Sequence, residues 1–172
     1  MPAPDVRLRD AAEADLPRIL AITNDAILRT TAIWSLEPTT LDERRAWLRG
    51  RRERGYPVLV AVGADGRVLG FGSYGEFRPR EGYRHTVEHS LYVDAAARGR
   101  GIGSALLSAL LERAAAEGRH AVVAGIDGEN HGSIRLHERF GFEHVGRLRE
   151  VGRKFDRWLD LVFMQRLLRA SG

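Results

Sequence analysis

The chain has 172 residues, of which 44% are hydrophobic and 29% charged, a composition that excludes a disordered or fibrous protein. The formal net charge of +4 is spread over 27 basic and 23 acidic residues without a basic tail, so we expect no nucleic-acid partner. Cysteine is absent, which excludes disulfides and thiolate metal sites, and no apolar run approaches the roughly 20 residues of a membrane span, so we expect a cytoplasmic protein without a membrane partner.

The hydrophobic pattern predicts strands from short apolar or alternating runs, and helices from apolar residues that recur every three or four positions. The expected elements are a strand at 6–9, helices at 16–26 and 41–54, strands at 58–62, 68–74 and 86–93, a helix at 102–117, a strand at 121–126, a helix at 133–140, and strands at 143–151 and 157–167. Antiparallel strands that lead into a strand–helix–strand unit predict one α/β domain over residues 1–172. Its mixed sheet should have about seven strands, with helices on both faces.

The segment from Leu91 to Ser104 carries the clearest chemical signal, because an apolar strand leads through a short loop into three glycines and a long helix. Glycines let the backbone approach a ligand closely, and the free N–H groups of a helix start attract phosphate. The spacing Gly99-x-Gly101-x-Gly103 does not match the dinucleotide-binding pattern, and the Gly-Lys-Ser/Thr of the phosphate loop is absent. We expect a different pyrophosphate ligand here; a turn that only connects strand to helix is the alternative.

The run Arg98-Gly99-Arg100-Gly101-Ile102-Gly103 resembles the coenzyme A loop of the GCN5-related N-acetyltransferase (GNAT) superfamily. Motifs that resemble its phosphinothricin and methionine-sulfoximine acetyltransferase branch occur at residues 24–26, 30–34, 72–75, 86–93, 130–137, 141–142 and 151–158. The resemblance implies the GNAT fold, in which two central strands splay apart. It also implies an enzyme that uses acetyl-CoA to acetylate the α-amino group of small amino acids or their analogues, by direct transfer through a ternary complex.

In that family the pantetheine arm lies between the splayed strands, and one strand N–H polarises the thioester oxygen. The resemblance implies that Leu91, Tyr92 and Val93 are the backbone partners of this arm. The other implied cofactor-binding residues are Arg98, Gly99, Arg100, Gly101, Ile102, Gly103, Ser104 and Asn130. Asn130 opens an expected helix, so helix capping is an alternative role that one side chain could combine with cofactor binding.

An acceptor amine must lose a proton before it can attack a thioester, because a free α-amino group has a pKa near 7.7–8.0. Alternation places Glu88 on the strand face opposite His89, roughly 10 Å before Leu91. Related enzymes of this branch use the matching glutamate as the base, and we expect that role for Glu88; a structural carboxylate paired with an arginine is the alternative.

His137 resembles a histidine that the branch places beside the active site. Two roles are open for it, the proton donor to the departing thiolate or a wall of the pocket. The other histidines, at 85, 89, 120, 131 and 144, show no metal-ligand spacing, and we expect them to be structural or solvated. No metal is expected.

A carboxylate of the acceptor can be held bidentately by Arg78 or Arg80, and Arg78 is the first choice. The resemblance implies that Thr31, Ile33 and Trp34 wall the acceptor pocket and that the segment from Lys154 and Phe155 to Trp158 reaches it from the partner subunit of a homodimer. The expected acceptor-binding residues are Thr31, Ile33, Trp34, Glu76, Phe77, Arg78, Arg80, Lys154 and Phe155. Surface placement of the arginines and ordinary aromatic packing are the alternatives.

Three other functions stay open on sequence grounds. A protein N-terminal or other amine acetyltransferase would need an open groove in place of a closed pocket. A non-catalytic acyl-CoA-binding regulator would be expected to lack a base, which Glu88 supplies. A nucleic-acid-binding module would bind through the arginines with a steep salt dependence and would transfer no acetyl group.

Overall fold

The computed structural model describes residues 5–168 and contains the elements in the expected order. The strands are β1 (Val6–Asp10), β2 (Val58–Gly63), β3 (Val68–Glu76), β4 (Thr86–Val93), β5 (Ala121–Asp127), β6 (Glu143–Lys154) and β7 (Arg157–Leu167). The helices are α1 (Leu16–Arg29), α2 (Leu41–Glu53), α3 (Ile102–Ala116) and α4 (His131–Arg139). The largest differences from the expectation are in α1 and β6, each of which continues three residues beyond its predicted end.

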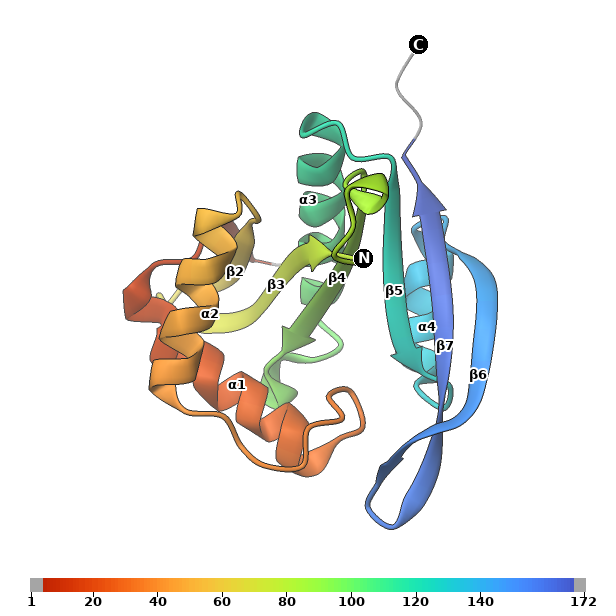
Figure 1. Ribbon diagram of the computed structural model, residues 1–172. Helices are drawn as coiled ribbons and strands as arrows, with labels where there is room; N and C mark the ends of the chain where they lie inside the picture. The colour runs from red at the N-terminus through yellow and green to blue at the C-terminus, as the bar shows by residue number, and fades with distance from the viewer. Residues whose placement is uncertain (1–4, 169–172) are drawn as a thin grey trace.

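The strands form one seven-stranded sheet in the order β1-β2-β3-β4-β5-β7-β6 (Figure 1). Every neighbouring pair is antiparallel except β4 and β5, which run parallel. The expected mixed α/β sheet is therefore confirmed.

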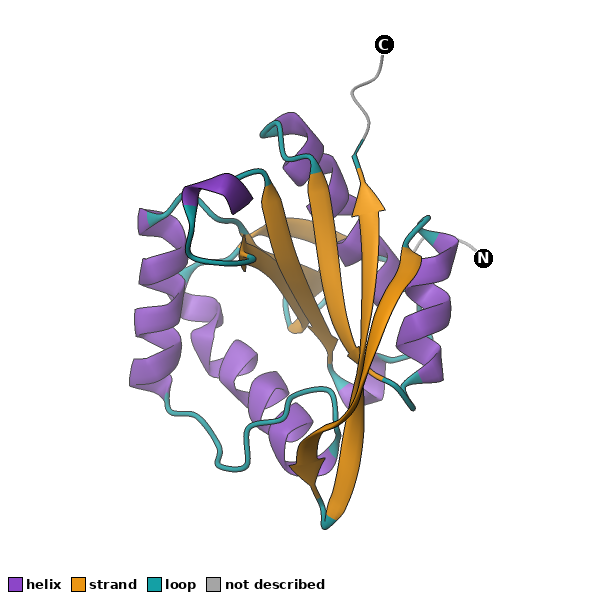
Figure 2. Cartoon of the chain, turned by 45° about the vertical axis from the view of Figure 1, so that its right-hand side comes forward, coloured by secondary structure: helices purple, strands orange, loops and turns teal. Residues whose placement is uncertain are grey.

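Helices cover both faces of the sheet (Figure 2). In β2, Val58 and Val60 pack into a core with residues of α1 and α2, whereas Leu59 and Ala61 pack into a second core with α3. Successive side chains of a strand point to opposite faces, so a strand buried on both faces must be apolar throughout. This explains why β2 reads as an uninterrupted apolar run.

The central strands β4 and β5 separate after a short paired stretch. They pair only through Thr86, Val87 and Glu88, which face Ala121, Val122 and Val123. Beyond this point β4 continues to pair with β3 as far as Val93, and β5 continues to pair with β7 as far as Asp127. The two strands diverge toward the lower end of Figure 1, which confirms the expected splay.

Among residues 5–168, no helix is long and apolar enough to cross a membrane.

Candidate active site

The glycine-rich turn leads directly into α3. Gly99 and Gly101 have φ values of 74° and 77°, in the left-handed region that favours glycine, and Gly101 is the N-cap of the helix. No side chain of the described residues caps this end, so the first N–H groups of a 15-residue helix point out of the turn. Arg98 and Arg100 are exposed on either side of Gly99. The turn therefore has the backbone donors and the positive charge that a diphosphate requires.

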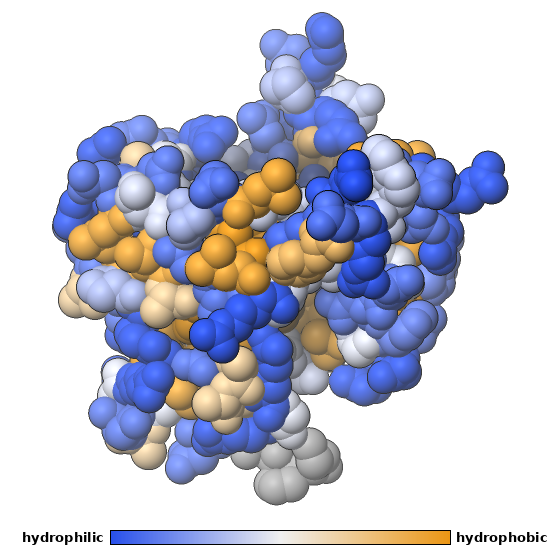
Figure 3. Space-filling view, turned by 90° about the horizontal axis from the view of Figure 1, so that it is seen from below, coloured by the Kyte–Doolittle hydropathy of each residue, from blue (hydrophilic) through white to orange (hydrophobic). Residues whose placement is uncertain are grey.

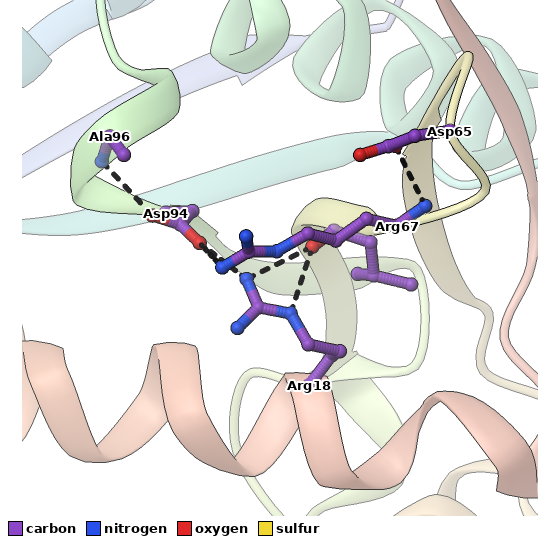
Figure 4. A network of polar contacts seen from close by, with 6 residues as sticks. Arg18, Asp65, Arg67, Asp94 and Ala96 are labelled. Carbon is purple, nitrogen blue, oxygen red and sulfur yellow. Dashed lines mark hydrogen bonds and ion pairs between the residues drawn. The ribbon is translucent and has the colours of Figure 1, made fainter.

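Asp94 fixes the entry to this turn through a small ionic network (Figure 4). One carboxylate oxygen accepts a hydrogen bond from the Ala96 N–H at 3.0 Å, and the other accepts from Arg18 of α1 and lies 3.4 Å from Arg67. Burial opposes the ionisation of Asp94, but the hydrogen bonds from Ala96 and Arg18 hold its pKa below the usual range. The network therefore joins the end of β4 to α1 and to the β2–β3 turn.

Glu88 lies where the two central strands part. It occupies the last β4 position that pairs with β5, and its side chain shares the α1/α2 face of the sheet with Tyr92. Gly125 of β5 leaves room for the carboxylate, because a Cβ there would lie 3.2 Å from Glu88 Oε1. Burial raises the pKa of Glu88, and the charge of Arg78 partly offsets this rise. A carboxylate with a raised pKa is a stronger base, as proton abstraction requires.

His137 lies on the opposite, α3/α4 side of the sheet and is only 3% exposed. Its Nδ1 donates to the Ser133 carbonyl at 2.7 Å, and its Nε2 lies 2.9 Å from Nε2 of His89. Burial lowers the pKa of His137, although the bond to Ser133 works in the other direction. With both ring nitrogens engaged and the charged form disfavoured, these contacts are those of a packing residue, and the proton-donating role of His137 stays a prediction.

His89 is the partner that the sequence did not reveal. Since Nδ1 of His137 carries a proton, its Nε2 accepts from His89, which leaves the buried Nδ1 of His89 without a partner among the described residues. Burial, with a smaller effect of His137, lowers the pKa of His89 to about 3. Both rings pack against Phe142, so the two neutral histidines form a structural contact between β4 and α4.

Asn130 is the N-cap of α4, where its side chain accepts a hydrogen bond from the Ser133 N–H at 3.1 Å. Capping is thus established for Asn130. The structure places it just after β5, at the end of the sheet where β4 and β5 have separated.

The loop between α1 and α2 is fastened to the C-terminal half of the chain. Lys154 is only 3% exposed, and its ammonium donates to the carbonyls of Ile27, Thr30 and Ile33 at 2.5, 2.8 and 2.5 Å. These three contacts tie Lys154 to the loop of its own chain, and its expected place at a partner's pocket stays a prediction. Phe155, at the hairpin tip, is 53% exposed.

Thr31 and Trp34 complete this attachment. The Thr31 hydroxyl donates to Asp127 at the end of β5, and Trp34 Nε1 donates to the Thr31 carbonyl at 2.9 Å. The Trp34 ring lies over Gly152 of β6, where a Cβ would approach it to 2.4 Å. The loop therefore bridges the open end of the splay, from α1 to the β5 and β6 strands.

A cavity of about 440 Å³ opens between this loop, α1, α2 and the face of β4 that carries Glu88. Ile33 lines it, whereas Thr31 and Trp34 do not. The lining residues are Thr23, Ile27, Ile33, Ser35, Glu37, Pro38, Thr39, Glu43, Arg44, Trp47, Phe71, Ser90 and Tyr92. Its size suits a ligand of a few to some twenty heavy atoms.

The loop after β3 places its charged side chains at the surface. Arg78 lies over the Phe77 ring, with Cζ 4.4 Å from the ring centroid, and its charge acts on Glu88. Arg80 is exposed beyond it, and Glu76 faces Arg54 at 3.6 Å. Of these residues, Arg78 is the one whose charge acts on Glu88. Among residues 5–168 no cluster of three or more histidine, aspartate or glutamate side chains could hold a metal ion.

Comparisons with known proteins agree with this geometry. A family model described as acetyltransferase (GNAT) family matches residues 19–142. An L-methionine sulfoximine/L-methionine sulfone acetyltransferase from Pseudomonas aeruginosa is 57% identical over 158 residues, which cover 92% of each chain.

Two solved structures resemble the whole chain. A phosphinothricin acetyltransferase from Sinorhizobium meliloti in complex with AcCoA has a TM-score of 0.93 and 40% identity, and covers 95% of this chain and 89% of its own. A ribosomal-protein-alanine N-acetyltransferase from Brucella melitensis has a TM-score of 0.92 and 51% identity, with 94% and 99% covered. The chain therefore belongs to the acetyltransferase (GNAT) family and is an N-acetyltransferase that uses acetyl-CoA.

Proposed function

We propose that the protein acetylates the α-amino group of free amino acids and their oxidised or phosphinic analogues, such as methionine sulfoximine, methionine sulfone and phosphinothricin. The observation that carries the proposal is the position of Glu88. Its carboxylate lies at the fork of β4 and β5, on the sheet face onto which a cavity of small-molecule size opens. The names of the relatives from Pseudomonas aeruginosa and Sinorhizobium meliloti support the same class of acceptor.

On the coenzyme side, the residues present fit acetyl-CoA, which supplies an activated acetyl thioester. Among the described residues, the edge of β4 that faces β5 has no ladder partner after Glu88, so those backbone groups of the stretch Leu91, Tyr92 and Val93 that do not pair with β3 are available for an amide-bearing ligand. The turn binds the diphosphate through its backbone and through arginine. The residues assigned to the turn are Arg98, Gly99, Arg100, Gly101, Ile102, Gly103 and Ser104, and Asn130, which follows β5 at the start of α4, is assigned to the coenzyme arm.

On the acceptor side, Glu88 removes the proton from the incoming ammonium group, directly or through one water. Arg78 lies at the same end and holds the α-carboxylate, because the amine and the carboxylate are bonded to a single carbon. Acceptor and coenzyme thus approach the fork from different sides. This arrangement supports direct transfer in a ternary complex, with no covalent acetyl-enzyme stage.

A free-thiol release assay with acetyl-CoA tests the proposal. The panel holds methionine sulfoximine, methionine sulfone, phosphinothricin, common amino acids and short peptides. We expect kcat/KM for at least one analogue to exceed that for every peptide by about 10-fold or more. Turnover of peptides alone would contradict the proposal.

A second candidate is acetylation of a protein N-terminus. It is favoured by the relative from Brucella melitensis, whose name specifies the alanine of a ribosomal protein. The fastened loop that covers the cavity argues against it, because an extended peptide needs a groove that is open at its far end. Peptides that begin with alanine, placed in the same assay, separate the two functions.

The assembly we propose is a homodimer formed through the β6–β7 hairpin. Exposed large apolar side chains collect there, with Trp158 60% exposed, and further members are Val145, Leu148, Val151 and Phe155. Viewed from the end that carries the hairpin tip, apolar residues gather in the middle of the surface (Figure 3). Such patches on a small protein favour a protein contact. Light scattering should give twice the chain mass, and Trp158→Asp should give the monomer mass.

A further inference from the structure

Arg44 of α2 lines the cavity, but it has no part in the proposed binding of acetyl-CoA or in the proposed contacts with the acceptor's amine and carboxylate. Its guanidinium stacks on the face of Trp47, with Cζ 4.9 Å from the ring centroid. Its buried Nε has no hydrogen-bond partner among the described residues, and burial lowers the pKa of the group. A half-buried guanidinium with free donors is costly unless a ligand satisfies it.

The surroundings of Arg44 define what it could bind. Ile27, Ile33 and Phe71 make part of the cavity wall apolar, and Ser90 and Tyr92 add hydroxyl groups from the strand that carries Glu88. Two carboxylates also border the cavity. Glu43 is engaged with Thr39 and Thr40 at the start of α2, and Glu37 is exposed.

The two arginines thus occupy different places. Arg44 lines the cavity from α2, whereas Arg78 follows β3 and is not among the described lining residues. The charge of Arg78 acts on Glu88. A carboxylate one carbon from the reacting amine must be held near the base, which assigns it to Arg78. Arg44 can then contact the opposite end of the acceptor, where the acceptor's side chain ends.

We infer that Arg44 binds the side-chain end of the acceptor and selects amino acids that carry oxygen acceptors there, such as a sulfone, sulfoximine or phosphinate. The inference rests on the proposed function, because it takes the amine to be at Glu88. A guanidinium offers several donors in a rigid plane, which suits two oxygens on one tetrahedral atom. A thioether or alkyl end would leave these donors unpaired within the cavity.

The test compares methionine sulfone with methionine, which has the same chain without the two oxygens. In the wild-type enzyme kcat/KM for the sulfone should exceed that for methionine by about 10-fold or more. In Arg44→Met this ratio should fall by about 10-fold, with kcat/KM for methionine and the KM for acetyl-CoA changed little. Arg44→Lys keeps the charge without the planar donors, and it should give an intermediate ratio.

Arg45→Met is the matched control, since Arg45 is the exposed neighbour that pairs with Asp42, and it should keep the wild-type ratio. Thermal unfolding checks that each variant folds. If Arg44→Met does not fold, the ratio measured for Arg44→Lys decides the question. A folded Arg44 variant with an unchanged ratio overturns the inference and leaves the proposed function standing. A wild-type enzyme that acetylates peptides but no free amino acid overturns both.

Discussion

The groups assigned to acetyl-CoA lie almost entirely in one stretch, residues 91–104, whereas the acceptor side is assembled from segments far apart in the sequence. The groups proposed for the first region are backbone groups of β4, the turn and the start of α3, and Gly99 and Gly101 have the left-handed conformation that the turn needs. In the second, side chains from α2, β4 and the loops surround a cavity. Coenzyme binding should therefore tolerate changes elsewhere, while acceptor choice should depend on contacts between distant segments.

The two regions meet at Glu88. Its backbone belongs to β4, the strand that leads to the glycine turn. Its side chain lies on the sheet face onto which the cavity opens. A substitution of Glu88 should slow acetyl transfer itself, and it should not act on the binding of one substrate in preference to the other. The following predictions run from the largest expected effect to the smallest.

Glu88→Gln should lower kcat by about 100-fold or more, because the base is lost, while the KM for acetyl-CoA stays close to the wild-type value. Wild-type kcat/KM should rise as the pH increases through the raised pKa of Glu88, and the variant should lack this rise. Steady-state rates from pH 5 to 9 measure both effects. Glu112→Gln, an exposed glutamate on α3, is the control.

Stability gives an independent check on the same variant. Burial raises the pKa of Glu88 in the folded protein, so its ionisation costs stability once the pH exceeds the pKa of the unfolded chain. Glu88→Gln removes that cost, and its thermal midpoint at pH 8 should not fall below that of the wild type. A lower midpoint would point to a structural ion pair as the main role of Glu88.

Lys154→Met should destabilise the protein by about 2 kcal/mol, because three backbone carbonyls lose a charged donor. Released from β6, the loop should also bind the acceptor less well, so the acceptor KM should rise while the acetyl-CoA KM does not. Denaturant unfolding and steady-state kinetics measure the two effects. The control is Arg153→Met, at the exposed neighbouring cation, which should change neither stability nor the acceptor KM. An equal rise in the KM values for acceptor and acetyl-CoA in Lys154→Met would remove the distinction between the two regions.

Gly101→Ala should raise the KM for acetyl-CoA by about 10-fold, since a side chain at a φ of 77° costs about 1–2 kcal/mol and the turn must shift to relieve it. The acceptor KM should hardly move. The control is Gly146→Ala, at a glycine where an added Cβ meets no atom within 4 Å. A selective rise in the acceptor KM would mean that the turn serves the other substrate.

Asp94→Asn should raise the KM for acetyl-CoA by about 5-fold or less, because the amide pairs poorly with Arg18 and Arg67 and the entry to the turn loosens. The effect should shrink at high salt, which screens the wild-type pairs as well. Asp65→Asn is the control from the same neighbourhood, since within residues 5–168 Asp65 accepts only from the backbone of Arg67. Equal kinetics for the two variants would exclude a positioning role for Asp94.

Much of the coenzyme side could be predicted from the sequence. The span of β4 and the start of α3 were predicted correctly, and alternation placed Glu88 and His89 on opposite faces. Gly125 could have been noticed, because an isolated glycine inside a strand often marks a close approach by another group. Asp94, directly after an apolar strand and before the glycine turn, carried a weaker signal.

The acceptor side resisted prediction for a physical reason. Arg44 is one of many arginines, and its sequence neighbours do not show that it faces a cavity. Lys154 donates hydrogen bonds to carbonyls up to 127 positions away in the sequence, and His137 contacts His89, which lies 48 positions away. The partners of such side chains are decided by how helices and strands pack, which no local pattern encodes.

The sequence by itself determined the element order, the glycine turn and the face of β4 that carries the base, because periodicity and backbone conformation depend on adjacent residues. Only the tertiary structure decided that His137 is buried against His89, that Lys154 holds its own loop, and that Arg44 faces the cavity. Each of these outcomes depends on desolvation and on partners from distant segments, and both exist only once the chain has packed.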